Sequence, residues 1–289
     1  MVDQQTYRVN ALAASSQLSL PLGAYRWSGQ SGDFAGKEAG ASMNFQDHRD
    51  YVPGDDPRHI NWQAYARAGS YIIKQYQEEV SPTVDVILDA SPSMFFTPEK
   101  EQRSSELLYL LSACSKKCGA HLHIHLLTGK THRSLSLEEL HTARWVDHIK
   151  APPVENTLLD TSRLILKPGS LRLFISDLLF QADPLSIIRP LTQRGGHFSC
   201  FIPYLLEEAN PTWLGNYEFQ DAETSQTQPH KITRESLEHY KTSYQRHFSL
   251  WFDAIRSIQG NYARLDSNES LMSSLSAEAI PRKLLDYSF

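Results

Sequence analysis

The sequence is poor in cysteine and has no long apolar run. Its three cysteines, Cys114, Cys118 and Cys200, are an odd number in 289 residues, which excludes a fold whose cysteines are all paired in disulfides. So few cysteines favour a reducing compartment. No stretch reaches the roughly 18 apolar residues of a membrane-spanning helix, and the first residues do not resemble a signal peptide. We therefore expect a cytoplasmic protein without direct membrane insertion.

Positive charge and nucleotide-binding motifs are also scarce. The chain has 28 Lys and Arg against 33 Asp and Glu, a formal net charge of −5, which argues against a nucleic-acid binder. Gly129-Lys130-Thr131 resembles the end of a phosphate-binding loop, but Ile124 occupies the position where that pattern needs a glycine. We expect no ATP hydrolysis, and no complete hydrolase motif indicates another enzymatic activity.

From about residue 81, short apolar strands alternate with amphipathic helices, as is typical of an α/β fold with a mostly parallel, doubly wound sheet. The expected strands are 84–89, 121–127, 170–177, 197–204 and 262–265, with a short edge strand at 131–137. The expected helices are 99–118, 157–166, 184–194 and 233–259, followed by a C-terminal helix. This pattern predicts one α/β domain over residues 81–289.

Two segments interrupt the alternation. Residues 1–80 are richer in glycine and short extended runs, so we expect an N-terminal β-rich or irregular elaboration there. Residues 207–232 have the polar, turn-rich composition of an inserted loop or hairpin.

Side chains with oxygen donors follow two of the expected strands. Asp89 ends the first strand and is followed by Ser91 and Ser93, while Asp177 ends the strand at 170–177. Thr157 opens the helix expected after a proline-containing loop. In a doubly wound sheet, ligands bind at the carboxyl ends of strands, where the strand order reverses. Because Mg²⁺ prefers hard oxygen ligands, these five residues predict a magnesium site, although Mn²⁺ and Ca²⁺ also suit such donors.

The same residues resemble the metal-ion-dependent adhesion site of von Willebrand A domains, which have a Rossmann-like fold. The resemblance implies that Ser91, Ser93 and Thr157 coordinate the metal directly. Asp89 and Asp177 would then act largely through water. It also implies that a carboxylate of a partner protein fills the open coordination position. Asn156 stands where a glycine often precedes the threonine.

A second motif lies upstream, between residues 51 and 69. Its sequence, YVPGDDPRHINWQAYARAG, closely resembles the segment that precedes the A-type domain in the bacterial domain-of-unknown-function family 58, DUF58. Members of that family are typically encoded beside AAA+ ATPases of the MoxR type. The resemblance therefore implies an adaptor that acts with such an ATPase on a client protein offering a carboxylate.

The residues of the upstream motif also allow structural inferences that do not depend on the family resemblance. Pro53-Gly54-Asp55-Asp56-Pro57 is a turn sequence, and the residues after it give an apolar face flanked by basic side chains. One interpretation is a structural clamp that docks the N-terminal segment on the sheet. The other is a partner surface led by Arg58, Trp62 and Arg67, since exposed Trp and Arg are common interface anchors.

Three alternatives remain open at this stage. In a haloacid-dehalogenase-like phosphatase, Asp89 would be the nucleophile, but Ser91 stands where that chemistry needs a second acid. A purely structural scaffold would keep the same residues as a vestigial metal site. His121, His123 and His125 share one strand face but are strung out along it, so a polar face is favoured over a zinc site.

Overall fold

The computed structural model describes residues 4–24, 43–78, 81–149, 159–222 and 226–288. The chain forms two compact units. The larger unit combines residues 1–25 with residues 82–289, and the smaller unit comprises residues 26–81. Among the described residues, no helix is long and apolar enough to cross a membrane.

The larger unit is built on a six-stranded sheet with the order β11-β8-β7-β4-β5-β6. All neighbouring pairs are parallel except β5 with β6. The strands are β4 (Thr83–Asp89), β5 (His121–Thr128), β6 (Thr131–Leu135), β7 (Leu171–Ile175), β8 (His197–Tyr204) and β11 (Asn261–Asp266). This sheet confirms the predicted α/β class with a mostly parallel sheet.

The order of strands reverses between β4 and β7. From β4 the chain runs outward to β5 and β6, then returns to β7 and continues to β8 and β11 on the other side. The carboxyl ends of β4 and β7 are therefore the switch point, which is where ligands bind in open α/β sheets.

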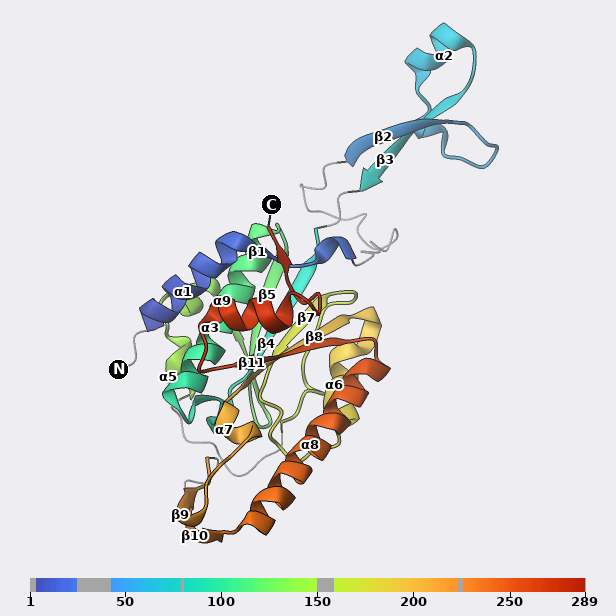
Figure 1. Cartoon of the computed structure of the whole chain (residues 1–289). Coiled ribbons are helices and arrows are strands. Elements are labelled where there is room, and N and C mark those ends of the chain that lie inside the picture. The colour runs from blue at the N-terminus through green and yellow to red at the C-terminus, as the bar shows by residue number, and fades with distance from the viewer. Residues whose placement is uncertain (1–3, 25–42, 79–80, 150–158, 223–225, 289) are drawn as a thin grey trace. The chain divides into compact units, whose positions relative to one another are not determined.

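Helices cover both faces of this sheet (Figure 1). The main helices are α1 (Gln4–Gln17), α3 (Pro98–Lys117), α6 (Pro184–Thr192) and α8 (Arg234–Ser257). The shorter ones are α4 (Leu137–His141), α5 (Trp145–Ile149), α7 (Leu206–Ala209) and α9 (Leu271–Ser274). Single turns lie at Leu22–Ala24 (η1), Pro92–Phe95 (η3), Gln193–Gly195 (η4) and Leu275–Ala279 (η5).

Local sequence explains where α3 and α8 begin. The Thr97 hydroxyl accepts a hydrogen bond from the Lys100 backbone N–H, and Pro98 fits the first helical position. Thr233 caps α8 in the same way through Ser236. The apolar face of α8 packs with α6 and one face of the sheet, and together they form a hydrophobic core around the fully buried Trp251.

The N-terminal helix differs from the sequence expectation, which placed residues 1–80 together in a β-rich segment. Residues 1–25 belong instead to the larger unit, where α1 packs against α3. The buried positions Tyr7, Ala11 and Ala14 form a helical stripe, and two of them are alanines. Because alanine carries little hydrophobic signal, the stripe is inconspicuous in the sequence.

The helix expected at 157–166 is the second departure. Residues 157 and 158 lie outside the described residues, and the described part, 159–166, is not helical. Asp160 accepts hydrogen bonds from the backbone N–H and the hydroxyl of Ser162, and the Thr161 hydroxyl donates to the Ile187 carbonyl. Such side-chain bonds to nearby backbone stabilise a turn in place of a helix.

Two small antiparallel pairs complete the larger unit. Strand β1 (Leu18–Ser19) pairs with β12 (Asp286–Tyr287). Strand β9 (Gly215–Gln220) pairs with β10 (Thr227–Ile232) in a hairpin that follows α7, within the segment 207–232.

The smaller unit contains the antiparallel strands β2 (Met43–Asp50) and β3 (Ile72–Glu78), with the turn η2 (Pro57–His59) and the helix α2 (Trp62–Ala68) between them. Asp55 holds the first turn, because its carboxylate accepts from the Arg49 guanidinium at 2.6 and 2.8 Å and from the Val52 N–H. Asn61 caps α2, and Gly69 ends it with a φ of 69°.

Candidate functional site

Asp89 lies at the switch point of the larger sheet and is completely buried. Its strand, β4, is paired on both sides, and the next residue, Ala90, donates its N–H to the Leu127 carbonyl of β5 at 2.7 Å. Strand β7 ends alongside at Ile175, so Ser176 and Asp177 reach the same edge. The strand ends alone therefore bring the two predicted aspartates to one place.

Both oxygens of Asp89 accept hydrogen bonds. One takes the Ser91 backbone N–H at 3.0 Å, and the other takes the Ser176 hydroxyl at 2.7 Å. Burial, and secondly the negative charge of Asp177, raise the pKa of Asp89 to about 7. The Asp89 carboxyl is thus much more easily protonated than a solvent-exposed aspartate, and a bound cation would favour its ionised form.

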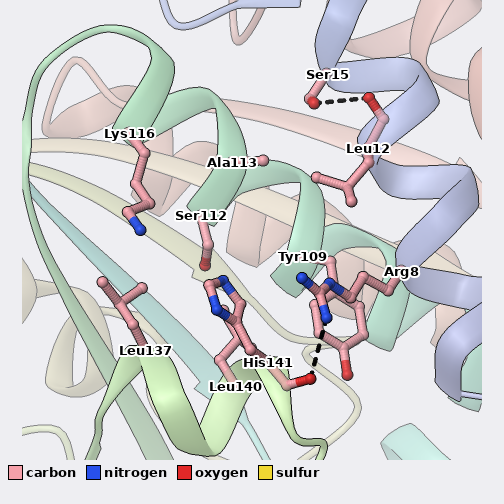
Figure 2. Close-up of a pocket in the computed structure, with 10 residues that line it drawn as sticks. All are labelled: Arg8, Leu12, Ser15, Tyr109, Ser112, Ala113, Lys116, Leu137, Leu140 and His141. Carbon is pink, nitrogen blue, oxygen red and sulfur yellow. Dashed lines mark hydrogen bonds between the residues drawn. The ribbon is translucent and has the colours of Figure 1, made fainter.

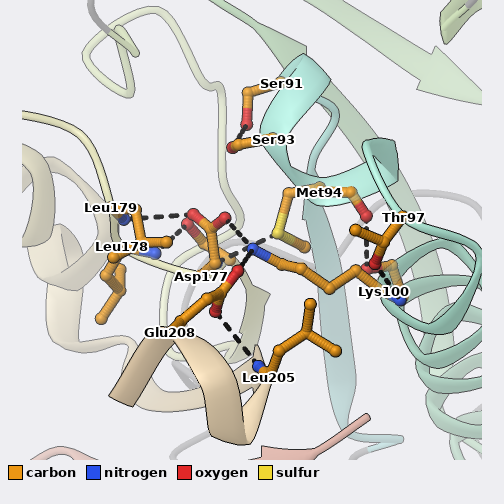
Figure 3. Close-up of polar contacts among 12 residues, drawn as sticks. Ser91, Ser93, Met94, Thr97, Lys100, Asp177, Leu178, Leu179, Leu205 and Glu208 are labelled. Carbon is orange, nitrogen blue, oxygen red and sulfur yellow. Dashed lines mark hydrogen bonds and ion pairs between the residues drawn. The ribbon is translucent and has the colours of Figure 1, made fainter. Parts of the chain in front are cut away.

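Ser91 and Ser93 lie in the turn that follows Asp89, where η3 begins at Pro92. Their hydroxyl oxygens are 3.2 Å apart, and both side chains are partly exposed (Figure 3). This close pair of hydroxyls next to a buried carboxyl is an arrangement of hard oxygen donors that suits a small divalent cation.

Asp177 is bound to a lysine that the sequence analysis missed. The Lys100 ammonium lies 2.6 Å from Asp177 Oδ2 and 3.0 Å from Glu208 Oε1, and both Lys100 and Asp177 are only 2% exposed (Figure 3). Burial by itself lowers the pKa of Lys100, but the charges of Asp177 and Glu208 outweigh it, so that pKa is raised. The lysine is therefore charged and neutralises one of the two aspartates.

A sequence signal for Lys100 did exist. It lies on the buried stripe of α3 with Ser104, Leu107 and Leu111, at steps of four, three and four residues. A lysine within such a stripe needs a buried acidic partner. Its partner, Asp177, is 77 residues away, so the pair became visible only in the fold.

The backbone after Asp177 is constrained. Leu178 has a φ of 58°, a left-handed conformation that residues with side chains seldom adopt, although its side chain is almost fully buried. Three bonds hold this turn: Leu178 N–H to the Ser176 hydroxyl, Leu179 N–H to Asp177 Oδ1, and His247 Nε2 to the Leu178 carbonyl at 2.6 Å. The position of the Asp177 carboxylate is thus fixed from both sides.

The predicted metal ligands are only partly assembled. The structure brings Asp89, Ser91, Ser93 and Asp177 to one edge, whereas Thr157 lies outside the described residues. Within the described parts of the chain, no cluster of three or more His, Cys, Asp or Glu side chains is arranged to hold a metal. The hydroxyl pair and the Asp89 carboxyl fit a divalent cation, but the Lys100 ammonium already occupies Asp177.

Of the three histidines on one face of β5, His125 is buried in a polar network. His125 contacts Asp85 Oδ1 through Nε2 at 3.3 Å and His132 Nε2 through Nδ1 at 3.0 Å. The Ser170 hydroxyl donates to the other Asp85 oxygen. These contacts satisfy His125 and Asp85 inside the sheet, whereas His121 is exposed and His123 is partly exposed.

In the smaller unit, the residues predicted as a partner surface are exposed. The Trp62 side chain is 59% exposed and meets Tyr65 edge to face, and Tyr65 in turn stacks on Tyr71 at 4.5 Å between ring centroids. Arg58 is exposed and pairs with Asp56, and Arg67 is exposed at the end of α2. The motif thus presents aromatic and cationic side chains on its surface.

The model of one protein family, described as "protein of unknown function DUF58", matches residues 47–249, more than half of the chain. The chain belongs to the DUF58 family. The matched region covers the Tyr51–Gly69 motif and, in the larger unit, Asp89, Ser91, Ser93 and Asp177. The family description assigns no activity to these residues. A search of curated proteins gave no match.

Two solved structures resemble this DUF58 chain weakly. One is an aerotolerance-related membrane protein from Bacteroides fragilis carrying multiple mutations to serine, 12% identical, with a TM-score of 0.39 over 68% of this chain and 98% of that one. The other is the conserved hypothetical protein BatB from Bacteroides thetaiotaomicron, 10% identical, with a TM-score of 0.39 over 68% of this chain and 96% of that one.

Proposed function

We propose that this DUF58 protein is a non-enzymatic, metal-dependent protein-binding adaptor. Ser91, Ser93 and Thr157 would coordinate Mg²⁺ directly, or Mn²⁺ or Ca²⁺ in its place, with Asp89 and Asp177 acting largely through water. The metal supplies an open coordination position, which a carboxylate of a client protein fills. The observation that carries the proposal is the hydroxyl pair of Ser91 and Ser93, 3.2 Å apart, beside the buried Asp89 at the switch point.

The resemblance of the sequence to DUF58 proteins encoded beside MoxR-type AAA+ ATPases supports such an ATPase as the second partner. In this proposal the adaptor acts in the cytoplasm and presents the client for assembly or remodelling. The exposed Arg58, Trp62 and Arg67 of the smaller unit are candidates for contacts with one of these partners.

A phosphatase is less well supported. Asp89 could serve as the nucleophile, but Ser91 stands where this chemistry needs a second acid to protonate the leaving group, and the pKa of Asp89 is raised to about 7. One specific observation favours the other alternative, a scaffold with a vestigial metal site. The Lys100 ammonium neutralises Asp177 without any metal.

Thermal unfolding with each divalent ion separates the adaptor from the scaffold. A ligand that binds only the folded state raises the melting temperature by mass action. We expect millimolar Mg²⁺ or Mn²⁺ to stabilise the wild type and to have no effect on Ser91→Ala/Ser93→Ala. Ser243→Ala/Ser249→Ala, which removes two exposed hydroxyls from α8, is the matched control. If no divalent ion stabilises the wild type, the metal mechanism is wrong and the result favours the scaffold.

Co-purification from the host tests the adaptor itself. Tagged wild type is expected to retain a MoxR-type ATPase or a client with Mg²⁺ and to lose the client with a chelator. Asp89→Asn keeps the size of the buried side chain and its bond from Ser176 but removes the negative charge. Retention of the client by Asp89→Asn in chelator, at the level of wild type in Mg²⁺, would rule out the metal mechanism.

A further inference from the structure

A hollow of about 290 Å³ lies between α1, α3 and α4, apart from the site described above (Figure 2). Arg8 from α1, Lys116 from α3 and His141 from α4 contribute basic groups to its wall. No Asp or Glu is among the residues that line it. This local excess of positive charge contrasts with the net charge of −5 for the whole chain.

The charges of the hollow are not neutralised within the described residues. Arg8 donates only to the backbone carbonyl of His141, at 3.1 Å, and the Lys116 ammonium has neither an ion pair nor a hydrogen bond there. Partial burial lowers the pKa of His141, and the nearby Arg8 and Lys116 lower it further. Arg8 and Lys116 therefore favour an anion from outside, whereas the lowered pKa of His141 favours its neutral form, which can still donate a hydrogen bond.

Apolar side chains and one unsatisfied hydroxyl complete the wall. Leu12, Leu137 and Leu140 contribute aliphatic surface, and Leu12 is 45% exposed at the rim. The Ser112 side chain is only 2% exposed, and its Oγ has no hydrogen-bond partner. This hydroxyl is therefore available to donate or accept a hydrogen bond when a group enters the hollow.

We propose that this hollow, defined by Arg8, Ser112, Lys116, Leu137, Leu140 and His141, binds an acidic peptide segment of a partner protein. A carboxylate would contact Arg8 and Lys116, while a neighbouring aliphatic side chain would cover Leu137 and Leu140. The Ser112 hydroxyl would donate to the same segment.

Size and charge select this occupant. The volume is at the lower end of the roughly 300–1,000 Å³ typical of small-molecule pockets, so it suits one or two amino-acid side chains better than a cofactor. An alternation of acidic and aliphatic groups matches a wall that is cationic on one side and aliphatic on the other. A free anion would leave the aliphatic part of the wall uncovered.

A displayed library of random octapeptides provides the probe. After selection on the full-length wild type, we expect Asp or Glu next to Leu, Ile, Val or Phe among the enriched peptides. Their affinities are then measured by fluorescence anisotropy for the wild type and for Arg8→Gln/Lys116→Gln. The matched control is Lys167→Gln/Arg189→Gln, which removes two charges from exposed positions outside the hollow.

The double substitution in the hollow is expected to weaken binding roughly tenfold or more, which corresponds to at least about 1.4 kcal/mol, while the control leaves it unchanged. Ser112→Ala is expected to weaken binding less, because it removes one neutral hydrogen bond. No enrichment, enrichment of peptides without acidic residues, or equal affinity for both double variants would overturn the proposal. Equally strong, hollow-dependent binding to vesicles of anionic phospholipid would also overturn it.

Discussion

The ammonium of Lys100 lies 2.6 Å from Asp177 Oδ2 in the interior of the larger unit, at the edge of the sheet where the strand order reverses. Charged groups this deeply buried are retained only when they are paired. Glu208 shares the same ammonium from α7, at the base of the β9–β10 hairpin. One lysine thus links a helix, the end of a strand and the inserted segment.

Replacing this lysine should destabilise the protein strongly. Lys100→Met keeps the aliphatic part of the side chain but leaves Asp177 buried without its cation, which typically costs about 3–5 kcal/mol. Urea unfolding of the wild type and the variant measures this difference. Lys241→Met, which removes a lysine from an exposed pair with Glu238, should change stability by less than about 1 kcal/mol. A loss of similar size in both variants would contradict the role assigned to Lys100.

The same variant should bind a divalent ion more tightly. In the wild type, the Lys100 ammonium repels a cation near Asp177 and uses one of its oxygens. Isothermal titration of folded Lys100→Met with Mn²⁺ is expected to show binding that is roughly tenfold tighter than in the wild type. Unchanged or weaker binding would mean that Lys100 and the metal do not compete.

Asp89 should make stability depend on pH. Its pKa is raised to about 7 in the folded state, above the usual value of 3.8, so between these values the folded state holds a proton that the unfolded state has lost. Stability therefore falls as pH rises through this window. Asp89→Asn cannot titrate, so its stability relative to the wild type should increase by about 2 kcal/mol between pH 5 and pH 8. Urea unfolding across this pH range, with chelator present, gives the free energy of unfolding of both proteins. Curves of this free energy against pH that run parallel for wild type and Asp89→Asn would disprove the prediction.

The contact between α1 and α3 can be tested by overpacking. Ala11 is fully buried in this contact, so Ala11→Leu should destabilise the fold by about 1–3 kcal/mol. Ala13→Leu adds the same side chain at an exposed position of α1 and should be nearly neutral. Thermal unfolding of the two variants measures the difference. Equal stability would mean that α1 does not pack as described.

Much of the larger unit could be predicted because its strands are apolar and its helices carry clear stripes. β4, β5, β8 and α8 lie close to their predicted ranges. Helix α1 was not predicted, because two of its buried positions are alanines. The turn after Leu159 was not predicted either, because the Asp160 side chain accepts a hydrogen bond from nearby backbone. The packing that fixes α1 is only weakly hydrophobic, and the hydrogen bonds that fix the turn are very local, so neither gives a clear periodic pattern.

The candidate site likewise contains some residues that the sequence pattern predicts and others that only the fold reveals. Asp89 and Asp177 were predicted together because carboxyl ends of parallel strands meet at one edge, which depends on local pattern and topology. Lys100 and Glu208 were not, since their ion pairs join segments 77 and 108 residues apart. The place of Lys100 on the buried stripe of α3 indicates a buried acidic partner, but no local pattern in the sequence identifies which acid it is.

The left-handed turn at Leu178 has a consequence for any binding at this edge. Asp177 is held by its backbone on one side and by Lys100 on the other, so its carboxylate has little conformational freedom left to lose. The entropy of ordering this group has already been spent in folding. Binding at this edge therefore does not have to order the Asp177 side chain, and differences between partners should arise from their own rigidity and charge.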